Sequence, residues 1–220
     1  MELETVIFDI DGLLVDSEPL WNEAAAETFL TYGVTLTDAQ YQTTTGLRTK
    51  EFLQWWLGYF RIAESELPIA EKKIITLVLE KIAQKATIMP GVPYIFDFFA
   101  RRGFKIGLAT SSPPALIELV MDMADIRRYV QAATSAETLL LGKPHPEVYL
   151  NCAGALDTKP IHCICFEDSF NGMIAAKSAR MKCVVVPHAS QAKSERWGAA
   201  DLKLSSLQNF GELHFNMLNG

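Results

Sequence analysis

Short, nearly continuous apolar runs recur along most of the chain and alternate with stretches of helical periodicity. Runs of this kind, rich in Val, Ile, Phe and Cys, are typical of strands that are covered on both faces. They predict strands at residues 5–10, 105–110, 129–133, 162–167, 183–187 and 201–204. The intervening helices are expected at residues 92–102, 113–123, 146–155 and 171–179. This order predicts an α/β fold with a doubly wound (Rossmann-like) parallel sheet core and right-handed crossovers.

One long stretch interrupts this alternation. Between residues 16 and 88 no strand pattern occurs, and the periodicity predicts helices at 20–31, 50–60 and 70–86. The simplest account is an inserted helical cap domain that covers residues 16–88. The sheet core then consists of residues 1–15 and 89–220, joined to the cap by linkers near residues 15–18 and 86–91.

Composition and charge narrow the class of protein. The 220 residues are 49% hydrophobic and 21% charged, which excludes a disordered chain. A net charge of −6 without a Lys/Arg cluster argues against nucleic acid or an anionic membrane as a partner. No apolar run approaches the ~20 residues of a membrane span, and the acidic start lacks a signal-peptide pattern. The four cysteines lie in apolar contexts and are expected to be reduced, so we expect a cytoplasmic protein.

Two pairs of acidic residues follow two of the predicted strands. Asp9 and Asp11 come at the end of the first strand, and Glu167 and Asp168 come at the end of the strand at 162–167. Because the carboxyl ends of parallel strands line the ligand crevice, these side chains are expected to lie close together. Carboxylates this close repel one another unless a cation separates them, and Mg²⁺ prefers such oxygen ligands. The sequence therefore predicts a Mg²⁺ site at this edge of the sheet.

Small hydroxyl residues and one lysine add the means to bind an anion. Thr110 and Ser111 stand between the second strand and the next helix, and offer hydroxyl and backbone N–H donors to phosphate oxygens. Lys143 lies between Gly142 and Pro144, which restrict where its ammonium can reach. Each motif alone is also typical of a turn, a helix cap or a solvated surface. The four motifs together, in this order, favour a phosphate site.

In order and spacing, these residues resemble the four motifs of the haloacid dehalogenase superfamily of phosphotransferases. The matching positions, from the first motif to the fourth, are Asp9-Ile10-Asp11-Gly12, Thr110, Lys143 and Glu167-Asp168. The helical insert resembles the cap of the beta-phosphoglucomutase-like subgroup. The phrases around the motifs resemble most those of the bacterial 2-deoxyglucose-6-phosphate and hexitol phosphatases.

This resemblance implies a Mg²⁺-dependent phosphatase that hydrolyses small phosphorylated sugars or sugar alcohols. Asp9 would attack phosphorus and carry an aspartyl-phosphate, while Thr110 and Lys143 would stabilise the charge on the phosphoryl oxygens. Asp11 would protonate the leaving alkoxide and then take a proton from the attacking water.

The same resemblance implies the metal ligands. The carboxylates of Asp9 and Asp168 and the backbone carbonyl of Asp11 would bind Mg²⁺. Glu167 would contribute either directly or through a water molecule.

Substrate selection is expected from the cap. Gly46-Leu47-Arg48 resembles the substrate-specificity loop of the family, in which Gly46 lets the backbone approach the crevice. Arg48 could bind sugar hydroxyls or a second anion, and Trp21, on the first cap helix, could line the crevice together with Ser111. The alternatives are a surface arginine for Arg48 and a core aromatic for Trp21.

Two other functions remain open at this point. A beta-phosphoglucomutase shares the motifs and the cap, but relatives with that activity resemble one another in a histidine near the position of Trp21. This cap contains no histidine. A phospho-accepting signalling receiver also uses an Asp, a metal ion, a Thr or Ser and a Lys at a sheet edge. It needs neither Asp11 nor a helical insert, and it is usually nearer ~120 residues in size. We expect a monomer, the default for a two-domain chain that opens and closes.

Overall fold

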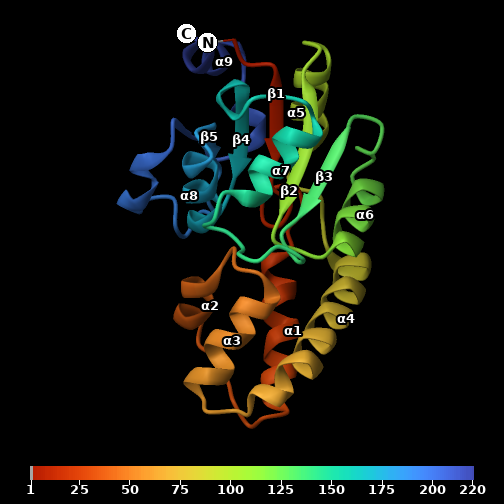
Figure 1. Ribbon diagram of the computed structural model, residues 1–220. Helices are drawn as coiled ribbons and strands as arrows, with labels where there is room; N and C mark the ends of the chain where they lie inside the picture. The colour runs from red at the N-terminus through yellow and green to blue at the C-terminus, as the bar shows by residue number, and fades with distance from the viewer. Residues whose placement is uncertain (1) are drawn as a thin grey trace.

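Six parallel strands form one sheet within residues 2–220, which the computed structural model describes. The strands are β1 (Thr5–Phe8), β2 (Lys105–Thr110), β3 (Ala132–Ser135), β4 (Cys163–Glu167), β5 (Lys182–Val185) and β6 (Leu202–Lys203). Their spatial order is β3-β2-β1-β4-β5-β6, so β1 lies inside the sheet and pairs with both β2 and β4. This confirms the predicted doubly wound α/β fold (Figure 1).

Helices cover both faces of the sheet. On one face lie α5 (Val92–Ala100), α6 (Pro114–Met123) and α9 (Glu212–Asn219); on the other lie α7 (Glu147–Ala155) and α8 (Phe170–Ser178). Short 3₁₀ helices η2 (Pro160–His162), η3 (Glu195–Ala199) and η4 (Leu207–Asn209) complete this part of the chain. The ring of Phe8 stacks on Phe96 and Phe166, with centroids 4.7 and 5.1 Å apart. Apolar strands are stable here because both of their faces are removed from water.

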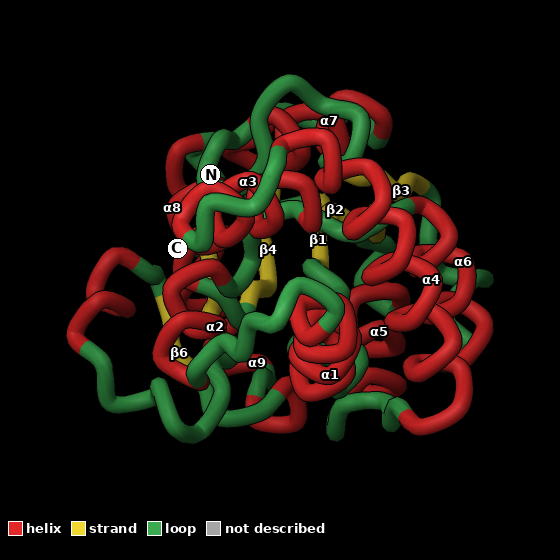
Figure 2. Tube along the Cα trace, turned by 90° about the horizontal axis from the view of Figure 1, so that it is seen from below, coloured by secondary structure: helices red, strands yellow, loops and turns green. Residues whose placement is uncertain are grey.

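The chain between β1 and α5 is helical. It forms α1 (Glu18–Leu30), α2 (Asp38–Thr44), α3 (Thr49–Tyr59), η1 (Glu64–Glu66) and α4 (Leu67–Lys85). These helices lie beyond the carboxyl ends of the strands (Figure 1), and a view from below shows them in front of the sheet (Figure 2). Within residues 2–220, no helix combines the length and the apolar character needed to cross a membrane.

The two segments that lead into and out of these helices run side by side. Val15 and Ile88 form an isolated antiparallel bridge. The N–H of Asp16 donates to the carbonyl of Thr87, and the N–H of Met89 donates to the carbonyl of Leu14, both at 2.9 Å. The division of the chain into a core and a cap at residues 16–88 stays a prediction, and these paired segments are where it would place the boundary.

The structure also differs from the predicted elements. The third strand begins at Ala132 rather than near residue 129, because Tyr129 and Val130 pack on the core from the turn before it. Helix α2 was not predicted, since its seven largely polar residues carry no apolar periodicity. A capping box between Thr37 and Gln40 marks its start instead. Helix α9, at the end of the chain, was not predicted either.

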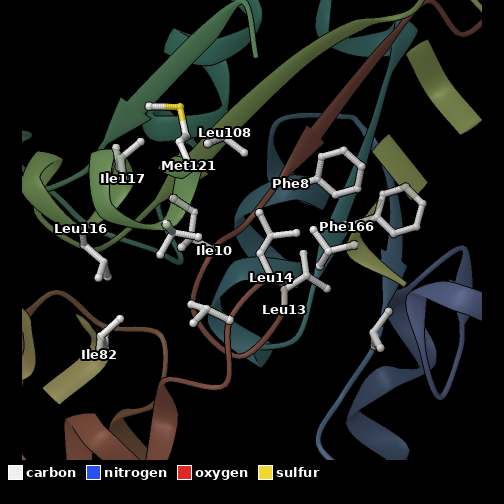
Figure 3. Packing of buried hydrophobic residues seen from close by; sticks show 14 of the residues in the cluster. Phe8, Ile10, Leu13, Leu14, Ile82, Leu108, Leu116, Ile117, Met121 and Phe166 are labelled. Carbon is white, nitrogen blue, oxygen red and sulfur yellow. The ribbon is translucent and has the colours of Figure 1, made fainter. Parts of the chain in front are cut away.

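Buried side chains hold the turn after β1 in place. Ile10, Leu13 and Leu14 are fully or almost fully buried, and Figure 3 shows them beside Phe8 in the apolar core. Gly12 stands between them at φ +70°, a conformation that side-chain-bearing residues rarely adopt. The polar residues of this turn are therefore carried on backbone that packing immobilises.

Candidate active site

Acidic side chains from β1 and β4 meet at the carboxyl edge of the sheet, as the sequence predicts. Asp9 follows β1, Glu167 ends β4, and Asp168 follows it; all three are buried. Their carboxylates can offer one oxygen each within 4.8 Å of one another. Gly12 is what allows this approach, because a Cβ at that position would lie 2.1 Å from Oδ2 of Asp168.

Lys143 lies inside this cluster rather than on the surface. Its ammonium donates to Oδ1 of Asp9 and to Oε1 of Glu167, each at 2.6 Å, and to the carbonyl of Ala109 at 3.1 Å. Burial alone would lower the pKa of Lys143, but the two carboxylates outweigh it and raise the pKa, so the ammonium stays charged. The lysine therefore places a fixed positive charge between the two acidic strand ends.

Glu167 is committed to protein donors. Besides Lys143, its Oε1 accepts from the hydroxyl of Tyr149 at 2.5 Å. Its Oε2 accepts from the backbone N–H groups of Asp168 and Ser169, at 3.1 Å each, and from the Ser169 hydroxyl at 3.0 Å. Five donors fill the roughly four lone-pair sites of a carboxylate. Glu167 thus holds Lys143 and the turn after β4, and has little capacity left for a cation.

The cluster fits a hard divalent cation. Three buried carboxylates face one ammonium, which leaves negative charge uncompensated. Burial, together with the nearby charges of Glu167 and Asp11, raises the pKa of Asp9 to about 8 despite the opposing effect of Lys143. Burial and Glu167 likewise raise the pKa of Asp168 well above its usual range. Both groups would ionise readily beside an ion that prefers oxygen ligands, such as Mg²⁺.

Asp11 is held by hydrogen bonds on both carboxylate oxygens. Its Oδ1 accepts from the Ser17 hydroxyl and from the indole Nε1–H of Trp21, both at 2.7 Å. Its Oδ2 accepts from the Ser112 hydroxyl at 2.6 Å and from the Thr110 hydroxyl at 3.4 Å. Residues on β2, after β2 and at the start of α1 therefore converge on this one carboxylate.

A cavity of about 360 Å³ opens beside this cluster, between the sheet edge and the helices of 16–88. Its lining from the sheet side includes Asp9, Asp11, Thr110, Ser111, Ser112, Lys143, Asp168, His188 and Gln191. From the helical side it includes Glu18, Trp21, Asn22, Tyr41, Gln42, Thr45, Gly46, Leu47 and Phe52. A volume near the lower end of ligand sites is suited to a small molecule that reaches from the charged edge into the helices.

The loop after α2 contacts the sheet edge directly. The hydroxyl of Ser111 donates to the carbonyl of Gly46 at 2.9 Å, and the side-chain amide of Asn171 donates to the carbonyl of Thr45 at 3.0 Å. Gly46 has φ +83°, and a Cβ there would lie 2.7 Å from Oγ of Ser169. Gly46 and Leu47 thus lie at the cavity, where the sequence placed them.

Arg48 differs from its predicted position, because it does not line the cavity in the described structure. Its guanidinium is buried and donates to the carbonyls of Ala136, Leu139 and Leu140, at 3.1, 2.5 and 3.2 Å. It also pairs with Glu51 at 2.6 Å. A guanidinium presents five N–H donors in a rigid fork. Here Nη1 and Nη2 donate to three carbonyls of one loop and to Glu51, while the buried Nε has no partner. The structure therefore places Arg48 at the loop before Lys143, and not on the surface or in the lining of the cavity.

Sequence reasoning missed several residues that contact the cluster. Ser112 comes two residues after Thr110, and Ser17 comes six residues after Asp11, so their nearness to the motifs in the chain was a usable signal. Tyr149 gave none, because it lies on an apolar helix and meets Glu167 only across the fold. Gly172 follows the fourth motif in the sequence, but its role is visible only in space: a Cβ there would lie 1.8 Å from Oε1 of Glu167.

Comparison with known proteins assigns the chain to a family. The family model of the haloacid dehalogenase-like hydrolases matches residues 3–180. The chain belongs to this family. This confirms the family that the four motifs predicted, and it makes the protein an enzyme of the hydrolase class.

Relatives within the haloacid dehalogenase-like hydrolases include named phosphatases. Hexitol phosphatase B of Escherichia coli strain K12 is 37% identical over 207 residues, which cover 94% of this chain and 93% of the relative. The phosphorylated carbohydrates phosphatase of Thermotoga maritima is 31% identical over 177 residues, with 80% and 82% covered.

Solved structures agree with this family. CbbY from Rhodobacter sphaeroides, in complex with phosphate, matches with a TM-score of 0.85 at 25% identity, covering 99% of this chain and 100% of that one. A beta-phosphoglucomutase from Clostridium difficile matches with a TM-score of 0.86 at 23% identity, covering 97% and 96%. At that identity the second match shows the shared fold alone.

Proposed function

We propose that the protein is a Mg²⁺-dependent phosphatase that hydrolyses small phosphorylated sugars or sugar alcohols through an aspartyl-phosphate. The observation that carries this proposal is Lys143, buried between Asp9 and Glu167 in the lining of the cavity. A fixed ammonium beside a strand-end carboxylate suits a phosphoryl group, because it offsets both the charge of the phosphate and that of the nucleophile.

In the first step, a carboxylate oxygen of Asp9 attacks phosphorus while the bond from phosphorus to the alkoxide oxygen breaks. Lys143 neutralises charge on the phosphoryl oxygens, and the hydroxyls of Thr110 and Ser111 line the same end of the cavity. Asp11, held from both sides, gives its proton to the leaving oxygen as that bond breaks.

In the second step, water attacks the phosphorus of the aspartyl-phosphate. Asp11, now a carboxylate, takes a proton from that water as the bond to Asp9 breaks. Inorganic phosphate leaves, Asp9 is regenerated as a carboxylate, and Asp11 is again protonated. Two carboxyl groups two positions apart in the chain thus divide nucleophilic and proton-transfer work between them.

Asp9 and Asp168, with the backbone carbonyl of Asp11, would hold the Mg²⁺. When bound, the ion supplies positive charge to the phosphoryl oxygens and keeps these buried carboxylates ionised. Glu167 is assigned to Lys143 and the turn after β4, because its oxygens already accept five hydrogen bonds.

The substrate class is supported by the cavity and by the relatives. Side chains that can pair with hydroxyl groups line its helical side, among them Asn22 and Gln42. Two of the relatives are named for hexitols and phosphorylated carbohydrates. The four buried, unpaired cysteines are suited to a reducing compartment, so we place this activity in the cytoplasm.

The test is phosphate release with Mg²⁺ from a panel of sugar, polyol and nucleotide monophosphates, with EDTA as the metal-free comparison. We expect release from sugar or polyol phosphates and its loss in EDTA. Asp9→Asn should lower turnover by roughly three orders of magnitude or more, with an unchanged circular dichroism spectrum.

Two results would contradict the proposal. Release from none of these phosphates would remove the phosphatase function, and substantial turnover by Asp9→Asn would remove the aspartyl-phosphate. Beta-glucose-1-phosphate belongs in the panel, because its conversion to glucose-6-phosphate would show a mutase instead.

A further inference from the structure

The start of the helical segment reaches the carboxylate of Asp11 with two donors. Ser17 and Trp21 are four residues apart, and the N–H of Trp21 donates to the carbonyl of Ser17 at 3.0 Å. Their side chains therefore lie on the same face of α1. Both donate to Oδ1 of Asp11, each at 2.7 Å. One face of one helical turn is thus directed at the carboxyl group that the proposed reaction uses for proton transfer.

Ser17 occupies the N-cap position of α1, yet its hydroxyl makes no cap hydrogen bond. A serine at an N-cap commonly accepts from a backbone N–H of the first helical turn. Here the hydroxyl is fully buried and donates to Asp11 instead. The Ser17 hydroxyl therefore bonds to the Asp11 carboxylate and not to the backbone of α1, where it would have stabilised the helix.

Trp21 differs in kind from the other groups around Asp11. The hydroxyls of Ser17, Ser112 and Thr110 can rotate and either donate or accept, whereas an indole N–H only donates. The Trp21 ring is half-buried against the apolar core, so its N–H has a fixed direction. Of these four partners, Trp21 is therefore the one that can only donate to the Asp11 carboxyl group, and it does so from a fixed direction.

We propose that Trp21 is a positioning residue for Asp11: its indole N–H fixes the carboxyl group for proton transfer to the leaving oxygen. This rests on the proposed function, in which Asp11 gives a proton to the alkoxide. As the bond from phosphorus to the leaving oxygen breaks, the proton moves from Asp11 to that oxygen. The resulting carboxylate is received by the donors already aimed at Oδ1, namely Trp21 and Ser17.

The test uses substrates of nearly the same shape whose leaving groups differ in their need for a proton. Phenol leaves poorly without protonation, whereas 4-nitrophenol leaves readily. Trp21→Phe keeps an aromatic ring and removes the N–H. We expect it to lower kcat/KM for phenyl phosphate by about tenfold or more relative to 4-nitrophenyl phosphate, since a general acid contributes roughly 10²–10⁴-fold when well placed.

Two further variants complete the experiment. Trp55→Phe is the matched control, because Trp55 is 62% exposed on α3, and it should leave both rates unchanged. Ser17→Ala removes the other donor to Oδ1 and should shift the ratio of the two rates in the same direction. It also keeps the inference testable should Trp21→Phe fail to fold.

The outcomes separate this inference from the function on which it rests. The positioning role would be overturned if both variants, Trp21→Phe and Ser17→Ala, lost kcat/KM equally on the two phosphates. It would also be overturned if neither variant lost kcat/KM on either phosphate. In both cases the wild-type enzyme would remain a phosphatase. A wild-type protein inactive on aryl and alkyl phosphates alike would overturn the proposed function itself. A selective loss on phenyl phosphate in both variants would support the role.

Discussion

Two glycines leave room for carboxylates in this site. A Cβ at Gly12 would collide with Oδ2 of Asp168, and a Cβ at Gly172 would collide with the carboxylate of Glu167. At Gly12 the backbone adds a second requirement, because φ is +70°. The arrangement of charge at the sheet edge therefore depends on side chains that are absent as much as on those that are present.

Gly12→Ala should weaken Mg²⁺ binding, because the methyl group would displace the Asp168 carboxylate. We expect the Mg²⁺ concentration for half-maximal phosphate release to rise by about tenfold or more. Metal affinity typically falls by this much when a group that holds a metal ligand in place is changed. Backbone strain should also lower stability by about 1–2 kcal/mol. Both are measurable, by Mg²⁺ titration of activity and by urea unfolding.

Gly33→Ala is the control for this variant. Gly33 has φ +69°, and within residues 2–220 no atom outside its own chain neighbours comes within 4 Å of the place where a methyl group would stand. The substitution therefore carries the same strain without a displaced carboxylate. It should lose similar stability with an unchanged Mg²⁺ requirement. An unchanged requirement in Gly12→Ala as well would show that Asp168 does not bind the ion.

At the scale of elements, hydrogen bonds join the start of α3 to the loop between β3 and α7. Arg48 and Glu51, at the start of α3, bind the carbonyls of Ala136, Leu139 and Leu140 and the N–H of Gly142. The next residue in that loop is Lys143. The helical segment thus holds the loop that delivers the ammonium to Asp9.

Arg48→Ala should lower kcat/KM for sugar phosphates and for 4-nitrophenyl phosphate by similar factors, about tenfold or more, because the loop that carries Lys143 loses its support. Steady-state kinetics on both substrates measures this. Lys50→Ala, at an exposed position of the same helix, should change neither rate. A loss confined to sugar phosphates would show instead that Arg48 contacts substrate.

Elements and site residues differed in how far the sequence could predict them. The strands at β1, β2 and β4 were predictable because strands buried on both faces are apolar throughout. Asp9, Thr110, Glu167 and Asp168 could be placed because each stands at a strand end. Lys143 lies in a loop, and its position was expected only from the family resemblance. Arg48 was misplaced because residue type reveals a charge but not its direction. Tyr149 could not be found, since its hydroxyl meets the carboxylate of Glu167 only through the folding of the chain.

For the whole molecule, the buried carboxyl groups make the free energy of unfolding depend on pH and on the bound cation. The pKa of Asp9 rises from 3.8 to about 8 on folding, chiefly through burial. A raised pKa means that the folded state binds the proton more tightly than the unfolded chain does. The stability that this proton confers is fully present below about pH 4 and is lost as pH rises through about 8. Asp168 shifts in the same direction.

In EDTA, the unfolding temperature should therefore fall as the pH rises from about 5 to about 8. Mg²⁺ should raise it more at the upper end of this range, where the cation replaces the missing proton. Differential scanning calorimetry measures both. Asp9→Asn should flatten the fall in EDTA, because an amide does not titrate. A wild-type unfolding temperature that stays level or rises in EDTA would contradict this account.

The bridge between Val15 and Ile88 has a consequence for how such an enzyme can change. The two segments run antiparallel and hydrogen-bonded, as the two arms of a β-hairpin do. Arms so placed can be joined by a turn of about two residues. The helices α1–α4 thus occupy the place of a hairpin turn, and the sheet does not have to part to admit them. Exchange of this segment for another would alter what enters the cavity without parting the strands that carry Asp9, Glu167 and Thr110.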